Sequence, residues 1–274
     1  MPRFIDFRPS GLCLPVFAVM RFTDTCRRLP FTCAVKAVAV CLLALAFAGC
    51  GKKETAANFR LILTADIQGR LVPCGCFTGQ LGGMTRLYTV LSQGSVTPEL
   101  RVDAGDALRG TQDFEQMEYE RILTAFQEMG FDALNLGARE AELSAQELRG
   151  FRDKFQAPLM SLNVLDAATG EPLLVPFIEV EKAGQKILVT GVLDPQSLGE
   201  RRLGDGLALA DPFLALRDAL PELRERADVL VLLAFAKEER LRELAESFFE
   251  ADFVLGGDVS QPSGNVREIN ESLV

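Results

Sequence analysis

The chain has 274 residues, seven cysteines, no histidine and a formal net charge of −9 at pH 7. Because histidine is absent, Ser-His-Asp and Cys-His nucleophile pairs, histidine general bases and histidine metal ligands are excluded. The acidic balance, with no block of basic residues, argues against nucleic acid as a partner, since phosphate binding needs clustered Lys and Arg.

The N-terminal region predicts export from the cytoplasm. Basic residues precede an apolar run at 37–49, which ends at Cys50. The run is too short to span a bilayer with ease, and its flanks are those of a signal peptide. Small residues directly before Cys50 resemble a bacterial lipobox, which implies a lipidated cysteine. We expect a signal peptide at 1–49, with Met20 as an alternative start; a plain signal peptide or a single membrane anchor are the alternatives.

The same pattern predicts a location in the bacterial cell envelope, on the periplasmic or extracytoplasmic face. The lipid on Cys50 would hold the protein at the membrane, and residues 50–58 would form a polar tether. Residues 1–49 carry a charge of +4, so subtracting it from −9 leaves −13 for residues 50–274. So acidic a domain does not bind anionic lipid by charge.

Strands and helices alternate through the first half of the predicted domain, which spans 59–274. Apolar residues recur at i, i+3, i+4 and i+7 along 115–129, and Ser144 with Glu147 forms a capping box. The predicted elements are strand 59–64, helix 84–93, strand 99–102, helix 115–129, strand 133–136 and helix 144–155.

The second half adds a hairpin, with arms at 171–181 and 185–193. Asp211 and Pro212 begin a helix that Pro221 is expected to kink or split. This alternation predicts an α/β layered domain. The sequence stops soon after its last predicted strand, which leaves truncation at the C-terminus open. The other predicted elements are strand 158–164, strand 227–235, helix 237–249 and strand 253–255.

Polar motifs follow four of the predicted strands, and strand ends are where α/β folds build metal and phosphate sites. The motifs are Thr-Ala-Asp66-Ile-Gln68-Gly, Asp103-Ala-Gly-Asp106, Leu136-Gly-Ala-Arg139-Glu140 and Leu255-Gly-Gly-Asp258. This ordered set resembles the calcineurin-like metallophosphoesterases, and most closely their periplasmic 5′-nucleotidase/UDP-sugar hydrolase branch. The resemblance covers about 59–261. It implies an α/β/β/α sandwich of two mixed sheets.

The resemblance also implies a site for two divalent metals, with metal-bound water attacking phosphorus. Asp66 and Asp106 match two of the family's aspartate ligands. Arg139 stands where the family has its catalytic histidine. Other residue types stand at the remaining ligand positions: Gln68, Ala138, Phe235 and Asp258.

These replacements change the expected chemistry. Asp66, Gln68, Asp106 and Asp258 would form an oxygen-only pocket, which suits one hard divalent ion such as Mg²⁺ better than Zn²⁺. Arg139 would bind an anion, but a guanidinium cannot act as an acid near neutral pH. Dinuclear hydrolysis is therefore not expected.

Cys74-Gly-Cys76 lies in the loop between Asp66 and the glycine pair at 82–83, and the nucleotidase pattern does not require it. In an oxidising compartment, a disulfide across one residue closes a small strained ring and is labile. Alternatively, the two thiolates hold one metal together with Asp66 and Asp106. We hypothesise that the pair gives a redox or single-metal site; an incidental disulfide is the alternative.

Three functions therefore stay open. The first is a non-hydrolytic lipoprotein with a phosphoesterase-like fold, which binds a ligand, a metal or a protein in the cleft where the family has its active site. The second is an active, metal-dependent, nucleotidase-like phosphoester hydrolase with a reduced ligand set. The third is a thiol-based redox protein, whose partner would be another envelope redox protein.

Overall fold

The computed structural model describes residues 5–6, 58–73, 82–258, 268–269 and 272–274. All of them belong to one compact unit. The expected signal peptide and tether lie outside the described residues, apart from 5–6 and 58, as do Cys50, Cys74 and Cys76. Among the described residues, no helix combines the length and the apolar character needed to cross a membrane.

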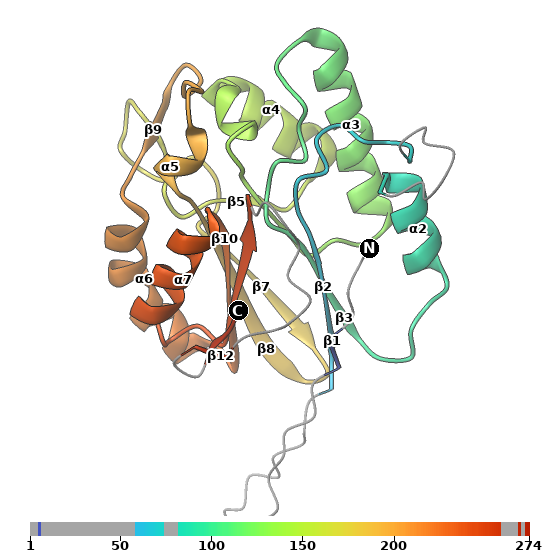
Figure 1. Cartoon of the computed structure of the whole chain (residues 1–274), viewed down its shortest axis with the longest axis vertical. Helices are drawn as coiled ribbons and strands as arrows, with labels where there is room; N and C mark the ends of the chain where they lie inside the picture. The colour runs from blue at the N-terminus through green and yellow to red at the C-terminus, as the bar shows by residue number, and fades with distance from the viewer. Residues whose placement is uncertain (1–4, 7–57, 74–81, 259–267, 270–271) are drawn as a thin grey trace, which may run out of the picture. The chain divides into compact units, whose positions relative to one another are not determined.

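Residues 60–160, together with the short β1 near the N-terminus, build a five-stranded sheet in the order β1-β2-β3-β4-β5 (Figure 1). Four of its strands are parallel, and the short β1 pairs antiparallel with β2. Its strands are β1 (Ile5–Asp6), β2 (Arg60–Thr64), β3 (Glu99–Asp103), β4 (Ala133–Asn135) and β5 (Leu159–Met160). Its helices are α2 (Met84–Ser92), α3 (Asp113–Glu128), the 3₁₀ helix η1 (Glu140–Glu142) and α4 (Ala145–Phe155).

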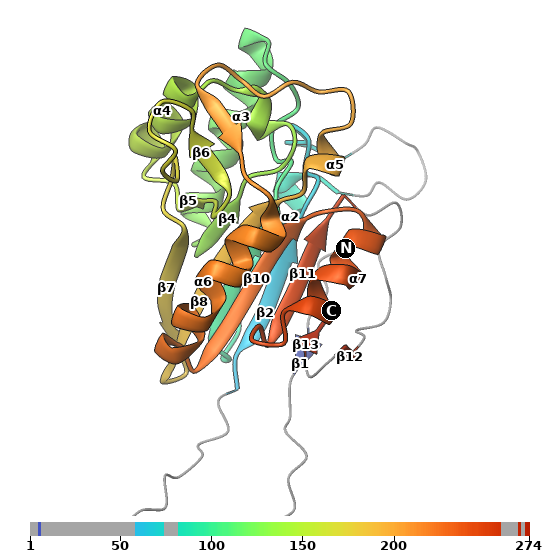
Figure 2. The ribbon, with the colours of Figure 1, turned by 90° about the vertical axis from the view of Figure 1, so that its left-hand side faces the viewer.

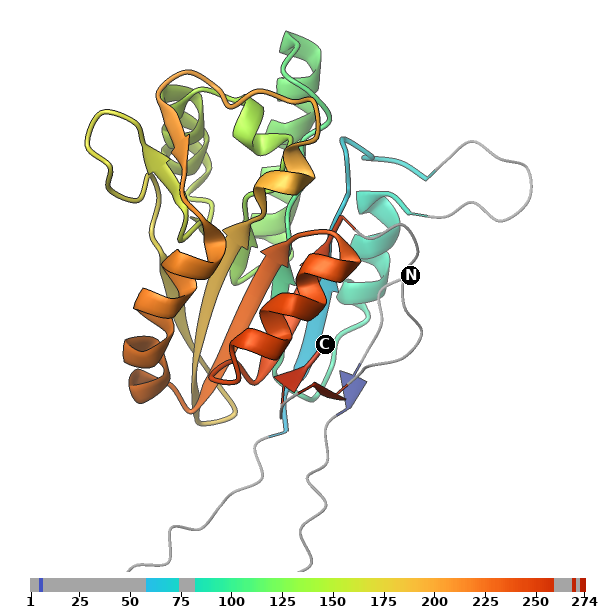
Figure 3. The same ribbon diagram turned by 60° about the vertical axis from the view of Figure 1, so that its left-hand side comes forward.

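The second half builds a six-stranded sheet in the order β12-β13-β11-β10-β8-β7. Its helices pack on one face, as Figures 2 and 3 show for α6 and α7. Its strands are β7 (Phe177–Lys182), β8 (Gln185–Leu193), β10 (Val229–Phe235), β11 (Phe253–Gly257), β12 (Glu268–Ile269) and β13 (Ser272–Leu273). The remaining elements are α5 (Pro195–Leu198), α6 (Pro212–Arg226), α7 (Glu238–Ser247) and a separate pair, β6 (Val164–Asp166) with β9 (Leu207–Leu209).

Three apolar clusters separate four layers. Strand β10 shows the alternation behind them, because successive side chains of a strand point to opposite faces. Val231 and Leu233 pack between the two sheets, whereas Leu230 and Leu232 pack toward α6 and α7. The third cluster lies between the first sheet and helices α2, α3 and α4. The predicted α/β/β/α sandwich is therefore confirmed.

The expected strand 158–164 is divided into β5 and β6, because the chain turns between them at 161–163. The buried Asn163 side chain fixes this turn: its Nδ2 donates to Leu193 O at 2.8 Å, and its Oδ1 accepts from Leu193 N at 2.9 Å. Of the kink or split expected at Pro221, the split is wrong, since α6 continues through this exposed proline to Arg226; the kink stays a prediction. The sequence patterns did not indicate η1, α5, β9 or the short strands β1, β12 and β13.

Candidate functional site

The loops that follow β2, β3 and β11 meet at one end of the two sheets. Asp66 N donates to Gly105 O at 2.9 Å, and Gln68 N donates to Asp106 O at 2.9 Å, so the first two loops run side by side. Asp258 N, at the end of β11, donates to Asp66 Oδ2 at 3.2 Å. The four residues predicted as an oxygen-only pocket are thus brought together from both sheets.

The same four residues adopt left-handed backbone conformations. Their φ angles are 54° at Asp66, 50° at Gln68, 58° at Asp106 and 58° at Asp258. A side chain in this region costs about 1–2 kcal/mol, and such strain gathers at functional sites. Among the described non-glycine residues, positive φ otherwise occurs only at a helix end, Gln156, and in the β7–β8 turn. The backbone of the loops that carry these four residues is therefore strained.

The buried side chain of Glu140 binds the backbone of the loops that follow β3 and β4. It is 1% exposed. Its Oε2 accepts from the backbone N–H groups of Asp106 (2.9 Å) and Gly137 (3.0 Å), and its Oε1 accepts from Leu108 N (2.7 Å). Glu140 belongs to one of the strand-end motifs, but its residue type predicts no role there. No local signal distinguishes it from Glu142, because a buried carboxylate is recognised by the backbone donors around it, and only the fold brings these together.

Arg139, which the family resemblance aligns with the catalytic histidine, contacts a carboxylate. Its backbone N–H donates to Asp106 Oδ1 at 2.8 Å, and its Nε lies 3.3 Å from Asp106 Oδ2. Its Nη1 donates to Arg109 O at 2.6 Å. Both oxygens of Asp106 therefore face the same arginine.

Burial dominates the electrostatics of these carboxyls. It raises the pKa of Asp66 and, together with repulsion by Glu140, raises the pKa of Asp106 to about 8. Burial also raises the pKa of Glu140, against its backbone donors, and raises that of Asp103 well above its usual range. The charge of Arg139 opposes the increase at Asp66 and Asp106. Arg139 thus favours the ionised forms of both.

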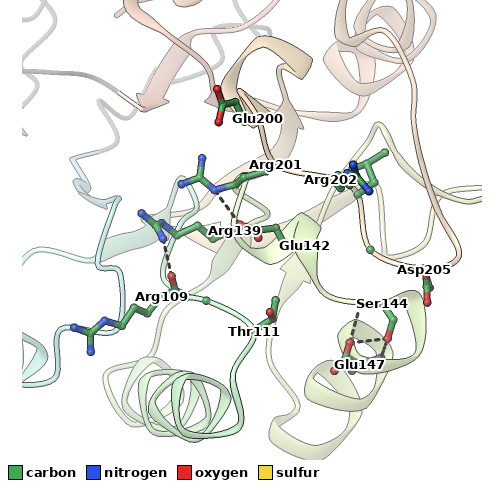
Figure 4. Close-up of a pocket in the computed structure, with 13 residues that line it drawn as sticks. Arg109, Thr111, Arg139, Glu142, Ser144, Glu147, Glu200, Arg201, Arg202 and Asp205 are labelled. Carbon is green, nitrogen blue, oxygen red and sulfur yellow. Dashed lines mark hydrogen bonds and ion pairs between the residues drawn. The ribbon is translucent and has the colours of Figure 1, made fainter.

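Two cavities open beside Arg139. One has a volume of about 1020 Å³ and is lined by residues that include Thr111, Arg201 and Arg202 (Figure 4). The other measures about 720 Å³ and reaches Gln68. Arg109 and Arg139 line both. In the larger cavity, Arg201 Nε pairs with Glu142 Oε1 at 2.9 Å (Figure 4). No sequence motif indicates that Arg109 and Arg201 belong here.

The described residues do not fit a dinuclear metal centre. Ala138 and Phe235 have no donor atom, and both are 1% exposed. Phe235 packs at the seam of the sheets, where a Cβ added to Gly257 would lie 2.6 Å from its ring. Within the described part of the chain, no group of three or more Cys, His, Asp or Glu residues is arranged to hold a metal ion. The oxygen-only pocket for one ion stays a prediction.

Comparisons with known proteins agree with this architecture. No model of a known protein family matches the sequence. A probable 5′-nucleotidase of Treponema pallidum is 29% identical over 163 residues, which are 58% of this chain and 28% of that protein. This chain therefore spans under a third of the length of that relative.

Two solved structures share the fold. A 5′-nucleotidase precursor from Thermus thermophilus superposes with a TM-score of 0.62 at 23% identity, over 72% of this chain and 41% of that one. The calcineurin-like phosphoesterase YfkN from Bacillus subtilis gives 0.58 at 19% identity, over 72% and 70%. With the strand-end loops gathered as described, the chain has the calcineurin-like metallophosphoesterase fold, and its relatives in sequence include 5′-nucleotidases.

Proposed function

We propose that this protein is an envelope lipoprotein whose 5′-nucleotidase-like site no longer hydrolyses phosphoesters. The observation that carries the proposal is the contact of Arg139 with Asp106. A guanidinium stands where the family has its catalytic histidine, and it cannot deliver a proton near neutral pH. Two further family ligand positions hold the buried side chains of Ala138 and Phe235.

The competing function is metal-dependent hydrolysis with a reduced ligand set, which the nucleotidase relatives support. A turnover assay separates the two. Purified protein is incubated with 5′-nucleotides and a chromogenic phosphate ester, with Mg²⁺, Mn²⁺, Co²⁺ or Zn²⁺ added in turn. We expect no metal-dependent phosphate release above the Asp106→Asn variant. Release that needs metal and is abolished by Asp106→Asn would establish the hydrolase instead.

The lipid on Cys50 is part of the proposal. It would place the protein at the membrane and would account for attachment of an acidic domain. Fractionation of cells that express the full chain tests it: Cys50→Ser should move the protein from the membrane to the soluble fraction. An unchanged membrane fraction would favour a transmembrane anchor.

A second candidate is a redox or single-metal site at Cys74 and Cys76, with an envelope redox protein as its partner. It is favoured by the position of the described residues on either side of the segment that contains the two cysteines. Gln68, Leu71 and Val72 line the smaller cavity with Arg139, and a Cβ added to Gly83 would lie 2.5 Å from the backbone of Val72. The segment that holds both cysteines therefore leaves and rejoins the fold beside that cavity.

Thiol counting with and without reductant, combined with metal analysis, tests this candidate. A redox site predicts two extra thiols after mild reduction, because a strained ring is easily opened. A single-metal site predicts one bound ion that is lost in Cys74→Ser. A disulfide that resists reduction, in protein without metal, would rule out both.

A further inference from the structure

The ionised carboxylates of the site favour a nearby cation. Asp66, Asp106 and Asp258 gather on neighbouring loops, and the buried Glu140 lies directly behind Asp106. In metal-dependent members of the fold, divalent ions supply the positive charge. Unpaired carboxylates held together in a partly buried site repel one another and lose solvation. A folded site without metal relieves this repulsion by protonation or by another positive group.

Arg139 is placed to be that group. It directly follows the loop after β4, and its backbone N–H binds one oxygen of Asp106 while its Nε approaches the other. Its Nη1 donates to the Arg109 carbonyl oxygen, which holds the guanidinium beside Asp106. The adjacent Glu140 binds Asp106 N and Gly137 N, which locks the two loops together.

We propose that Arg139 is a built-in cation that replaces a divalent ion and keeps the Asp66, Asp106 and Asp258 cluster closed to divalent metals. This inference rests on the proposed loss of hydrolysis and gives it a cause. A metal ion bound at Asp106 would meet a guanidinium a few ångströms away, and like charges at that separation repel strongly in a partly buried site. It would also have to displace the contacts on both carboxylate oxygens.

A metal titration of three proteins tests the inference. Mn²⁺ is titrated calorimetrically into the wild-type chain, Arg139→Gln and the control Arg202→Gln. Glutamine removes the charge but keeps a donor that can reach toward Arg109 O. Arg202 lines the same cavity and is exposed, so its replacement changes the local charge equally without touching Asp106. Mn²⁺ suits carboxylate and amide oxygens.

We expect Arg139→Gln to bind Mn²⁺ about tenfold or more tightly than the wild type, which corresponds to about 1.4 kcal/mol. Arg202→Gln should remain at the wild-type affinity. Adding Asp106→Asn to Arg139→Gln should abolish the gain. Arg139→Lys keeps a positive charge, so this variant should bind Mn²⁺ no more tightly than the wild type. Should Arg139→Gln fail to fold, as circular dichroism would report, Arg139→Met replaces it as the neutral variant of similar length.

Two results would overturn the inference. One is wild-type protein that binds Mn²⁺ as tightly as Arg139→Gln, with the binding lost in Asp106→Asn. The other is an Arg139→Gln variant that binds no more tightly than Arg202→Gln. Wild-type protein that binds Mn²⁺ through Asp106 yet releases no phosphate would refute this inference alone. Metal-dependent turnover by the wild type would refute the proposed function as well.

Discussion

At the scale of single residues, the Glu140 carboxylate ties together the loops after β3 and β4. It accepts three backbone N–H groups, and no water can reach them, since Glu140 is buried. A buried donor left without its acceptor costs about 1–3 kcal/mol. The shape of the site therefore depends on a residue with no place among the ligand positions.

We predict that Glu140→Ala lowers the free energy of unfolding by about 3 kcal/mol or more, because three donors lose their acceptor together. Urea denaturation measures the change. The control is Glu142→Ala, two residues on, whose partner Arg201 is partly exposed; it should cost about 1 kcal/mol or less. Equal losses in both variants would contradict the supporting role of Glu140.

The buried carboxyls also predict a dependence on pH. An acid whose pKa is raised by folding stabilises the fold fully below its unfolded-state pKa, and this contribution is lost as the pH rises through the folded-state pKa. For Asp106 the window extends from 3.8 to about 8. The pKa values of Asp66, Asp103 and Glu140 are raised in the same direction. Stability should therefore fall as the pH rises across this window.

We predict that Asp103→Asn reduces the loss of stability with rising pH, because a neutral amide carries no charge to bury. Melting temperatures between pH 5 and pH 8 measure it. Asp218→Asn, on the exposed face of α6, should keep the wild-type slope. An Asp103→Asn variant that follows the wild-type slope would show that burial of the Asp103 charge does not cause it.

At the scale of elements, sequence patterns located most helices and strands because their signals are local. The capping box at Ser144 predicted the start of α4, and its Oγ accepts from Glu147 N at 3.2 Å. The end of β5 was missed because its cause is distant: Asn163 bonds to the end of β8, thirty residues away. Likewise, β9 exists because it pairs with β6. Contacts between distant segments leave no local pattern.

The segment between α5 and β9 is one such case, and Gly204 is its point of contact. Gly204 N donates to Ala141 O at 2.8 Å, and an added Cβ would lie 1.9 Å from Leu143 O. We predict that Gly204→Ala costs about 1–3 kcal/mol, the usual penalty of overpacking. Thermal unfolding measures it.

Gly150→Ala is the matched control for Gly204→Ala. Gly150 lies inside α4, and an added Cβ would meet nothing within 4 Å. Alanine should stabilise the helix there by about 0.5–1 kcal/mol. A Gly204→Ala variant as stable as Gly150→Ala would contradict the close packing of this segment against η1.

At the scale of the whole molecule, the two sheets meet at the site. The predicted fold implied that Asp66, Asp106 and Asp258 would gather there, and they do. The sequence could not show where the arginine side chain would point. Arg139 was expected to bind an anion, yet its side chain contacts Arg109 O and the Asp106 carboxylate of its own chain. Side-chain direction depends on the cavity around it, which only the assembled sheets define.

Phe235 closes the seam between the sheets, at the end of β10. It is 1% exposed and contacts the backbone at Gly257. We predict that Phe235→Ala lowers the free energy of unfolding by about 3–5 kcal/mol through the cavity it leaves, as measured by urea denaturation. Phe249→Ala, at a side chain that is 68% exposed, should change it by about 0.5 kcal/mol or less. Similar decreases in the free energy of unfolding of both variants would contradict the packing of Phe235 between the two sheets.

The central claim is that the gathered aspartates hold no catalytic metal, because Arg139 takes its place. The most direct test is the metal content of wild-type protein and Asp106→Asn, both purified without chelator and measured by mass spectrometry. Any metal held elsewhere cancels in the comparison. We expect equal metal content in the two proteins. One or more equivalents of divalent metal in the wild type that are missing from Asp106→Asn would contradict it.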